Sequence, residues 1–60
     1  MQPIRLGDRG DPVRDVQGRL LALGFHVDAL EVDDHRFGDS TEGALRAFQQ
    51  ERGLLVDGLV

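Results

Sequence analysis

The chain has 60 residues, and at 6.6 kDa it is long enough for one small domain but not for two. It contains no cysteine, so neither a disulfide framework nor a cysteine zinc site compensates for a small core. Seven arginines against eleven acidic residues give a net charge of −4, which argues against nucleic-acid binding because phosphate neutralisation needs a basic face. No apolar run approaches the ~20 residues of a membrane span, so we expect no membrane partner.

The first predicted element is a helix over residues 12–23. Asp11 is expected as its N-cap, and Pro12 suits the first helical position. Its apolar residues follow the 3-4-3 spacing of one buried stripe: Val13, Val16, Leu20 and Leu23. Gly24 is predicted to end the helix because glycine adopts the left-handed conformation without steric cost, and Phe25 is then expected to fold back onto the last turn.

A second helix is predicted over residues 40–52, with Gly38 or Asp39 as its cap. If Asp39 is the cap, Glu42 stands where a capping box requires an acidic residue. The predicted apolar stripe consists of Ala44, Leu45 and Phe48, and Phe37 completes the predicted core. A glycine followed by an apolar residue, at positions 53 and 54, repeats the stop signal of the first helix.

The eleven residues between the two helices, 26–36, predict an ordered loop, with one short turn as a further option. Val27, Leu30 and Val32 are expected to anchor this loop. The two loop-helix halves resemble each other, because Leu6-Gly7-Asp8 matches Phe37-Gly38-Asp39, which suggests a pseudo-symmetric pair.

The end of the chain reads as the start of a further element. Residues 56–60 form a turn sequence with an apolar lead-in, which normally introduces another element. We therefore predict an all-α fold, a small orthogonal three-helix bundle whose third helix is truncated at the C-terminus, in one domain over residues 1–60. Apolar side chains near the end are expected to be poorly covered: Leu54, Val56, Leu59 and Val60.

Two sequence signatures follow each other along the chain. The first comprises Gly7, Asp8, Gly10, Val13, Val16, Gln17, Leu20, Leu23, Gly24 and Phe25. The second comprises Phe37, Gly38, Thr41, Ala44, Leu45, Phe48, Gln49, Gly53, Leu54, Asp57 and Gly58. Together the two signatures, in this order, resemble the three-helix peptidoglycan-binding domain family, and the resemblance covers roughly residues 5–60.

This resemblance implies a non-catalytic module that binds peptidoglycan or its peptide stems and attaches a linked cell-wall hydrolase to its substrate. The N-terminal pattern looks most like modules ahead of an N-acetylmuramoyl-L-alanine amidase. Two features depart from the family. The family often has Asp-Gly before Phe-Gly, whereas His35 and Arg36 precede Phe37 here, and the loop over residues 26–36 is longer and more acidic than usual.

The ligand site is predicted at the two Gly-Asp segments, residues 7–8 and 38–39, and along the second helix. The candidate ligand-binding residues are Gly38, Asp39, Thr41, Arg46 and Gln49. Gly38 would let the backbone approach a ligand, and free amides at the helix start would hold a carboxylate. Arg46 and Gln49 are three residues apart and are predicted to share a face. Arg36 is a further candidate because a guanidinium suits a stem-peptide carboxylate. For Gln17, and equally for Gln49, we favour hydrogen bonds to neighbouring loop backbone over a role at the ligand.

Metal and catalytic sites find little support. The histidines and acids of residues 26–35 lack the spacing of a zinc or calcium site. The single serine, Ser40, falls at a helix start with no histidine placed as its base, so we predict neither catalytic residues nor a cofactor.

Two other function classes stay open. A protein-interaction or regulatory module of a cell-wall enzyme homologue would keep the fold without binding glycan. A helix-turn-helix DNA binder is disfavoured by the net charge and the long connection. The parent chain would place the module in the cell wall or outside the cell if it is exported. The 60 residues show no signal peptide, so a cytoplasmic location is the alternative.

Overall fold

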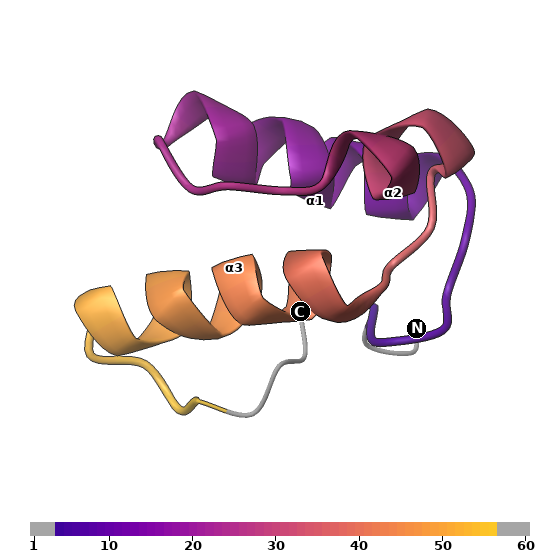
Figure 1. The fold of residues 1–60 in the computed structure, drawn as a ribbon. Helices are drawn as coiled ribbons and strands as arrows, with labels where there is room; N and C mark the ends of the chain where they lie inside the picture. The colour runs from indigo at the N-terminus through magenta and orange to yellow at the C-terminus, as the bar shows by residue number, and fades with distance from the viewer. Residues whose placement is uncertain (1–3, 57–60) are drawn as a thin grey trace.

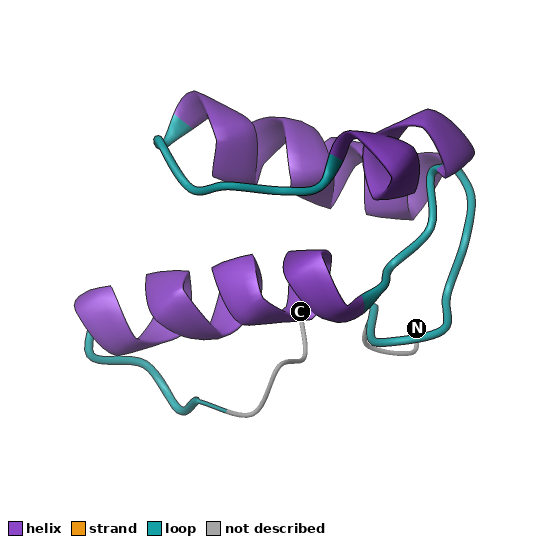
Figure 2. Ribbon diagram, viewed as in Figure 1, coloured by secondary structure: helices purple, strands orange, loops and turns teal. Residues whose placement is uncertain are grey.

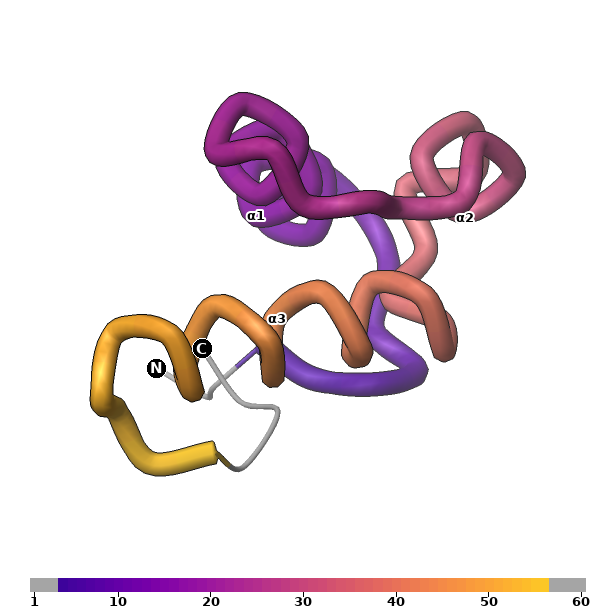
Figure 3. The backbone as a smooth tube through the Cα atoms, turned by 60° about the vertical axis from the view of Figure 1, so that its left-hand side comes forward, coloured from indigo at the N-terminus to yellow at the C-terminus, as the bar shows by residue number. Residues whose placement is uncertain are grey.

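The computed structural model describes residues 4–56, and these form three α-helices and no strand. Helix α1 spans Asp11–Ala22, α2 spans Ala29–Asp34 and α3 spans Asp39–Glu51 (Figures 1 and 2). Helices α1 and α2 lie in one layer and α3 in the other (Figure 1). In Figure 3, α1 and α2 are seen nearly end-on while α3 is seen along its length, so α3 crosses beneath them. The predicted all-α fold class is confirmed.

The helix predicted beyond residue 56 lies outside the described residues, as do Leu59 and Val60. Leu54 and Val56 are exposed, as expected. None of the helices in residues 4–56 is long and apolar enough to cross a membrane.

The start of α1 differs from the prediction. Asp11 is already helical, and Gly10 is the N-cap, with no side-chain hydrogen bond to the first amides. Gly10 has φ 105°, a conformation that glycine adopts without strain, and its carbonyl accepts from the Arg14 amide at 3.1 Å. The predicted capping role of Asp11 is therefore wrong, although its charge still favours the first turn of the helix. At α3, Gly38 rather than Asp39 is the cap.

All three helices end in the same hydrogen-bonded motif. After α1, the amide of Phe25 donates to the Leu20 carbonyl and that of Gly24 to the Leu21 carbonyl, both at 3.0 Å, which is the Schellman pattern. The same pair of bonds follows α3 at Gly53 and Leu54, so both predicted glycine stops are confirmed. It also follows α2, where His35 takes the left-handed position with φ 49°.

The segment predicted as a loop contains the six-residue helix α2. Asp28 is its N-cap, and the Asp28 carboxylate accepts from the Leu30 amide at 2.9 Å. Val27 is buried and Val32 packs against the core as expected, but Leu30 is largely exposed, which corrects its predicted anchoring role. Leu30 lies on the outer side of a helix that the loop prediction did not include.

The core lies between the two layers. Its buried apolar residues are Val13, Leu20, Val27, Phe37, Ala44 and Leu45, and Ile4, Val16, Phe25, Val32 and Phe48 pack against them. The rings of Phe25 and Phe48 meet edge to face with centroids 6.2 Å apart. The prediction is wrong for Leu23, which is 50% exposed because it is the C-cap beyond the last turn of α1.

Replacing His35 by glycine should stabilise the protein. A non-glycine residue in the left-handed region costs about 1–2 kcal/mol, of which the greater freedom of glycine in the unfolded chain offsets about 0.5–1 kcal/mol. We expect His35→Gly to raise the free energy of unfolding by about 0.5–1 kcal/mol in urea titrations. Gly24→Ala, which places a side chain at φ 92°, is the opposite control and should destabilise. A less stable His35→Gly variant would show that the imidazole makes compensating contacts.

Candidate functional site

The two matching Gly-Asp segments of the sequence lie side by side. The Gly7 amide donates to the Phe37 carbonyl and the Phe37 amide donates to the Asp8 carbonyl, each at 2.9 Å. Arg9 and Arg36 form an isolated antiparallel bridge next to these bonds. This pairing joins the N-terminal segment to the start of α3.

The carboxylate of Glu31, from α2, lies at the N-terminus of α3. Its Oε1 accepts hydrogen bonds from the amides of Gly38 and Thr41, both at 3.0 Å, and from the Thr41 hydroxyl at 2.8 Å. Its Oε2 accepts from the Ser40 amide at 3.0 Å. The first amides of a helix have no partner within the helix, and they carry its positive partial charge. Glu31 therefore caps α3 from a different helix.

The ionisation of Glu31 reflects these contacts. The residue is 93% buried, with 7% of its surface exposed, and burial by itself raises a carboxyl pKa because it disfavours the charged form. Hydrogen bonds from the Thr41 amide and hydroxyl and from Ser40 outweigh this effect and lower the pKa of Glu31 from 4.5 to about 2. The carboxylate is thus charged at neutral pH although it is buried.

A buried amide extends this network to α1. Gln17 is fully buried, and its Nε2 donates to the carbonyls of Glu31 at 3.3 Å and Arg36 at 2.9 Å and to the Thr41 hydroxyl at 3.1 Å. The Thr41 hydroxyl accepts from Gln17 and donates to Glu31, which makes a continuous chain. The two carbonyl partners fix the orientation of the Gln17 amide. The predicted structural role of Gln17 is confirmed.

Gly38 is held against the Glu31 carboxylate. A Cβ atom at this position would lie 2.6 Å from Cδ and 2.8 and 2.9 Å from the two carboxylate oxygens of Glu31. The close approach expected of Gly38 is therefore made to a side chain of the same protein. The expectation of free amides is likewise wrong for Gly38, Ser40 and Thr41, because all three donate to Glu31.

An open pocket of about 310 Å³ is lined in part by this carboxylate's residue, Glu31. Leu6 and Gly7 of the N-terminal segment and residues 36–39 complete the lining. A larger hollow of about 640 Å³ follows α1 near Arg19. That hollow is lined by α1 alone, whereas the smaller pocket joins three segments and a buried charge, so we take the smaller one as the candidate site.

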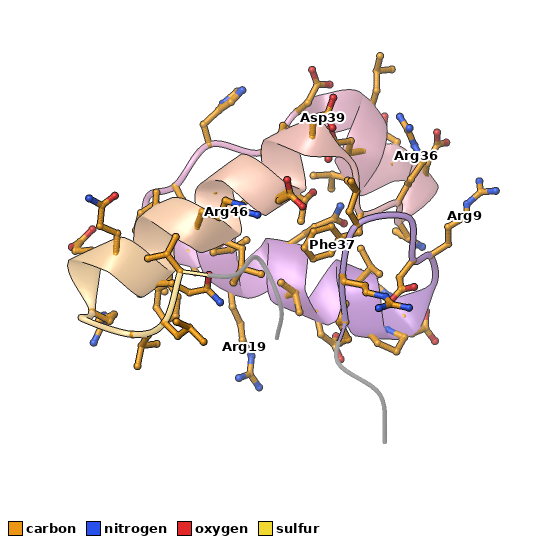
Figure 4. The ribbon with its side chains drawn as sticks, turned by 90° about the horizontal axis from the view of Figure 1, so that it is seen from below. Arg9, Arg19, Arg36, Phe37, Asp39 and Arg46 are labelled. Carbon is orange, nitrogen blue, oxygen red and sulfur yellow. The ribbon has the colours of Figure 1, made fainter. Side chains whose placement is uncertain are left out.

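The structure separates the five predicted ligand residues. Gly38 and Asp39 line the pocket. Thr41 is fully buried and engaged with Gln17 and Glu31, which gives it a structural role. Arg46 lies further along α3, exposed and 3.8 Å from Glu42 Oε1 (Figure 4). Gln49 is only 5% exposed, so the prediction that it presents a donor beside Arg46 is wrong. Ligand binding by any of the five stays a prediction.

The first Gly-Asp segment was predicted to belong to the ligand site, and its Gly7 lines the pocket together with Leu6. One part of the site was missed from the sequence. Glu31 was assigned no role, yet Asp28 and Glu31 have the Asp-x-x-Glu spacing of a helix start. Within residues 4–56, no group of three or more histidines, cysteines or acids is placed to hold a metal ion.

Residues 9–60 match the family described as "putative peptidoglycan binding domain". The chain belongs to this family. It is 39% identical to N-acetylmuramoyl-L-alanine amidase CwlM of Mycobacterium tuberculosis, with 95% of the chain and 16% of that enzyme covered. It is 44% identical to the spore cortex-lytic enzyme of Halalkalibacterium halodurans, with 98% and 17% covered.

The fold also matches a solved structure of the SleB N-terminal domain, with TM-score 0.87 and 42% identity over 98% of this chain and 77% of that one. The chain thus spans about a sixth of the two enzymes and most of a domain solved by itself. The family is one of binding domains, in agreement with the predicted non-catalytic module.

The Glu31 carboxylate should make stability depend on acid pH. Its folded-state pKa of about 2 lies below the ordinary value of 4.5, so the folded protein binds fewer protons than the unfolded chain. The stabilisation of the folded state by ionised Glu31 is therefore complete above pH 4.5 and is lost as the pH falls toward 2. It amounts to about 3 kcal/mol. We expect urea titrations between these pH values to show this loss in the wild type and not in Glu31→Gln. Parallel pH profiles for the two proteins would contradict the assignment.

Two glycine substitutions on α3 and its cap should have opposite effects. Gly38→Ala forces the new methyl group against Glu31 and should cost about 1–3 kcal/mol, as overpacking does. Gly43→Ala, where a Cβ meets nothing within 4 Å, should stabilise by about 1 kcal/mol because alanine favours a helix. Thermal unfolding of both variants measures the difference. Equal effects would mean that the Gly38 contact with Glu31 is not tight in solution.

Proposed function

We propose that this domain binds peptidoglycan through its peptide stems, in the pocket between the N-terminal segment and the start of α3. Membership of the family supports the wall polymer as the ligand. The observation that supports this location is the pocket itself, because the two Gly-Asp segments pair there next to the capped start of α3. Its volume of about 310 Å³ lies at the low end of small-molecule sites, which suits one residue of a peptide rather than a long glycan.

The proposed role is to hold a linked cell-wall hydrolase at its substrate. A binding domain joined to an enzyme raises the local substrate concentration without contributing to the chemistry. The relatives include an N-acetylmuramoyl-L-alanine amidase and spore cortex-lytic enzymes, and a hydrolase of the amidase type is our proposal for the linked domain. The proposal places the domain in the cell wall or outside the cell.

Asp39 offers a test of the pocket. It is exposed at the rim, beside Arg36, where it can accept from an ammonium or amide group of a peptide. Asp15→Ala on α1 is the matched control, because it removes the same charge from an exposed helix position outside the pocket. In co-sedimentation with purified sacculi we expect the wild type and Asp15→Ala to pellet with the wall and Asp39→Ala to bind roughly tenfold more weakly. A folded wild type that stays in the supernatant would exclude wall binding and favour the regulatory module.

Arg46 tests whether the contact surface continues along α3. Its ion pair with Glu42 is long and solvent-exposed, so the guanidinium remains available to a ligand. We propose that it binds an outer part of the stem, and that Arg46→Ala weakens sacculus binding roughly tenfold, as loss of a charged hydrogen bond does. Full binding by Arg46→Ala together with weak binding by Asp39→Ala would confine the site to the pocket.

A further inference from the structure

Arg9 and Arg36 lie opposite each other in the backbone bridge next to the pocket. The Gly10 amide donates to the His35 carbonyl and the Phe37 amide to the Asp8 carbonyl, both at 2.9 Å. These bonds lie on either side of Arg9 and Arg36 and do not join them, so the two residues form a non-hydrogen-bonded antiparallel pair. In such a pair the Cβ atoms are only ~4.5–5.5 Å apart. Figure 4 shows both arginines at the same end of the molecule, away from Arg19 and Arg46.

This pair has no counter-ion within the described part of the chain. Both side chains are exposed, and the ion pair found in residues 4–56 joins Arg46 to Glu42. Two nearby carboxylates are engaged elsewhere, because Asp8 accepts from the Arg5 amide and Glu31 accepts four hydrogen bonds at α3. Asp39 lines the same pocket as Arg36, but it forms no ion pair with either arginine in residues 4–56. Like charges directly opposite each other are destabilising. The folded protein therefore keeps two adjacent cations together although its net charge is −4.

We infer that Arg9 and Arg36 together bind a carboxylate of the peptide stem at the edge of the pocket. The inference rests on the proposed function and assigns the chemistry of its ligand. Arg36 lines the pocket and Arg9 is its partner across the bridge, so a group bound to both lies beside the residue held in the pocket. Guanidinium groups bind carboxylates through paired hydrogen bonds, and the bound anion would relieve the repulsion between the arginines.

The charges around the pair favour a carboxylate over other wall groups. The pocket already contains the carboxylates of Glu31 and Asp39, which repel a doubly charged phosphate monoester more strongly than a singly charged carboxylate. A phosphodiester has the same single charge as a carboxylate, so sacculi stripped of phosphate polymers are used to distinguish these two ligands. An uncharged sugar would leave both guanidinium groups without a counter-ion.

The test uses co-sedimentation of the whole protein with purified sacculi at low salt. We expect Arg9→Gln combined with Arg36→Gln to weaken binding roughly tenfold or more, as loss of charged hydrogen bonds does. Arg14→Gln combined with Arg19→Gln removes the same charge from exposed positions of α1 and should bind like the wild type. Because the pair repels itself without ligand, its removal should not lower the unfolding temperature. Full binding by the Arg9 and Arg36 double variant, or equal losses in both double variants, would overturn the inference.

Chemically altered walls test the ligand with the wild-type protein, independently of how the variants fold. Sacculi whose carboxyl groups have been amidated should bind the wild type as weakly as the double variant binds the untreated wall. Sacculi stripped of phosphate polymers by hydrofluoric acid should bind the wild type fully. Full binding to amidated walls, or lost binding to phosphate-free walls, would refute a carboxylate ligand. A wild type that binds no form of the wall would refute the proposed function itself.

Discussion

The arrangement of this small domain depends on one buried charge at the start of a helix. Glu31 is charged although it is buried, because three amides and one hydroxyl at the N-terminus of α3 donate to it. A buried carboxylate without such partners would cost several kcal/mol. Here the unpaired amides of α3 and the charge of α2 satisfy each other. This contact fixes the short helix against the long one in a chain that has no disulfide.

The same contact shapes the candidate site. Gly38 lies against the carboxylate, which brings the backbone before α3 close to α2. Gln17 ties the carbonyls of Glu31 and Arg36 to α1. The Phe37 backbone then pairs with the N-terminal segment and places Arg36 opposite Arg9. The groups proposed to meet a ligand are therefore exposed side chains on a backbone that buried polar groups hold in place, as a preorganised site requires.

Local sequence signals predicted much of this structure, and long-range contacts account for the rest. Glycine stops and apolar spacing located α1 and α3 to within one or two residues, because both depend on neighbours along the chain. Six residues of α2 are too few to show a clear apolar period, and the buried residue of this helix is Glu31, which a pattern of apolar residues does not reveal. The amides that we expected to be free at the start of α3 instead donate to Glu31, which lies seven residues before Gly38.

The most direct test of this account is the ionisation of Glu31 in solution. Carboxyl-labelled protein would allow the ¹³C resonance of each glutamate to be followed by NMR from neutral to acid pH, and Glu31→Gln would assign the resonance. We predict a titration midpoint for Glu31 near pH 2, with the amide resonances of Gly38, Ser40 and Thr41 moving at the same pH. A midpoint near 4.5, with those amides unaffected, would show that the carboxylate does not cap α3.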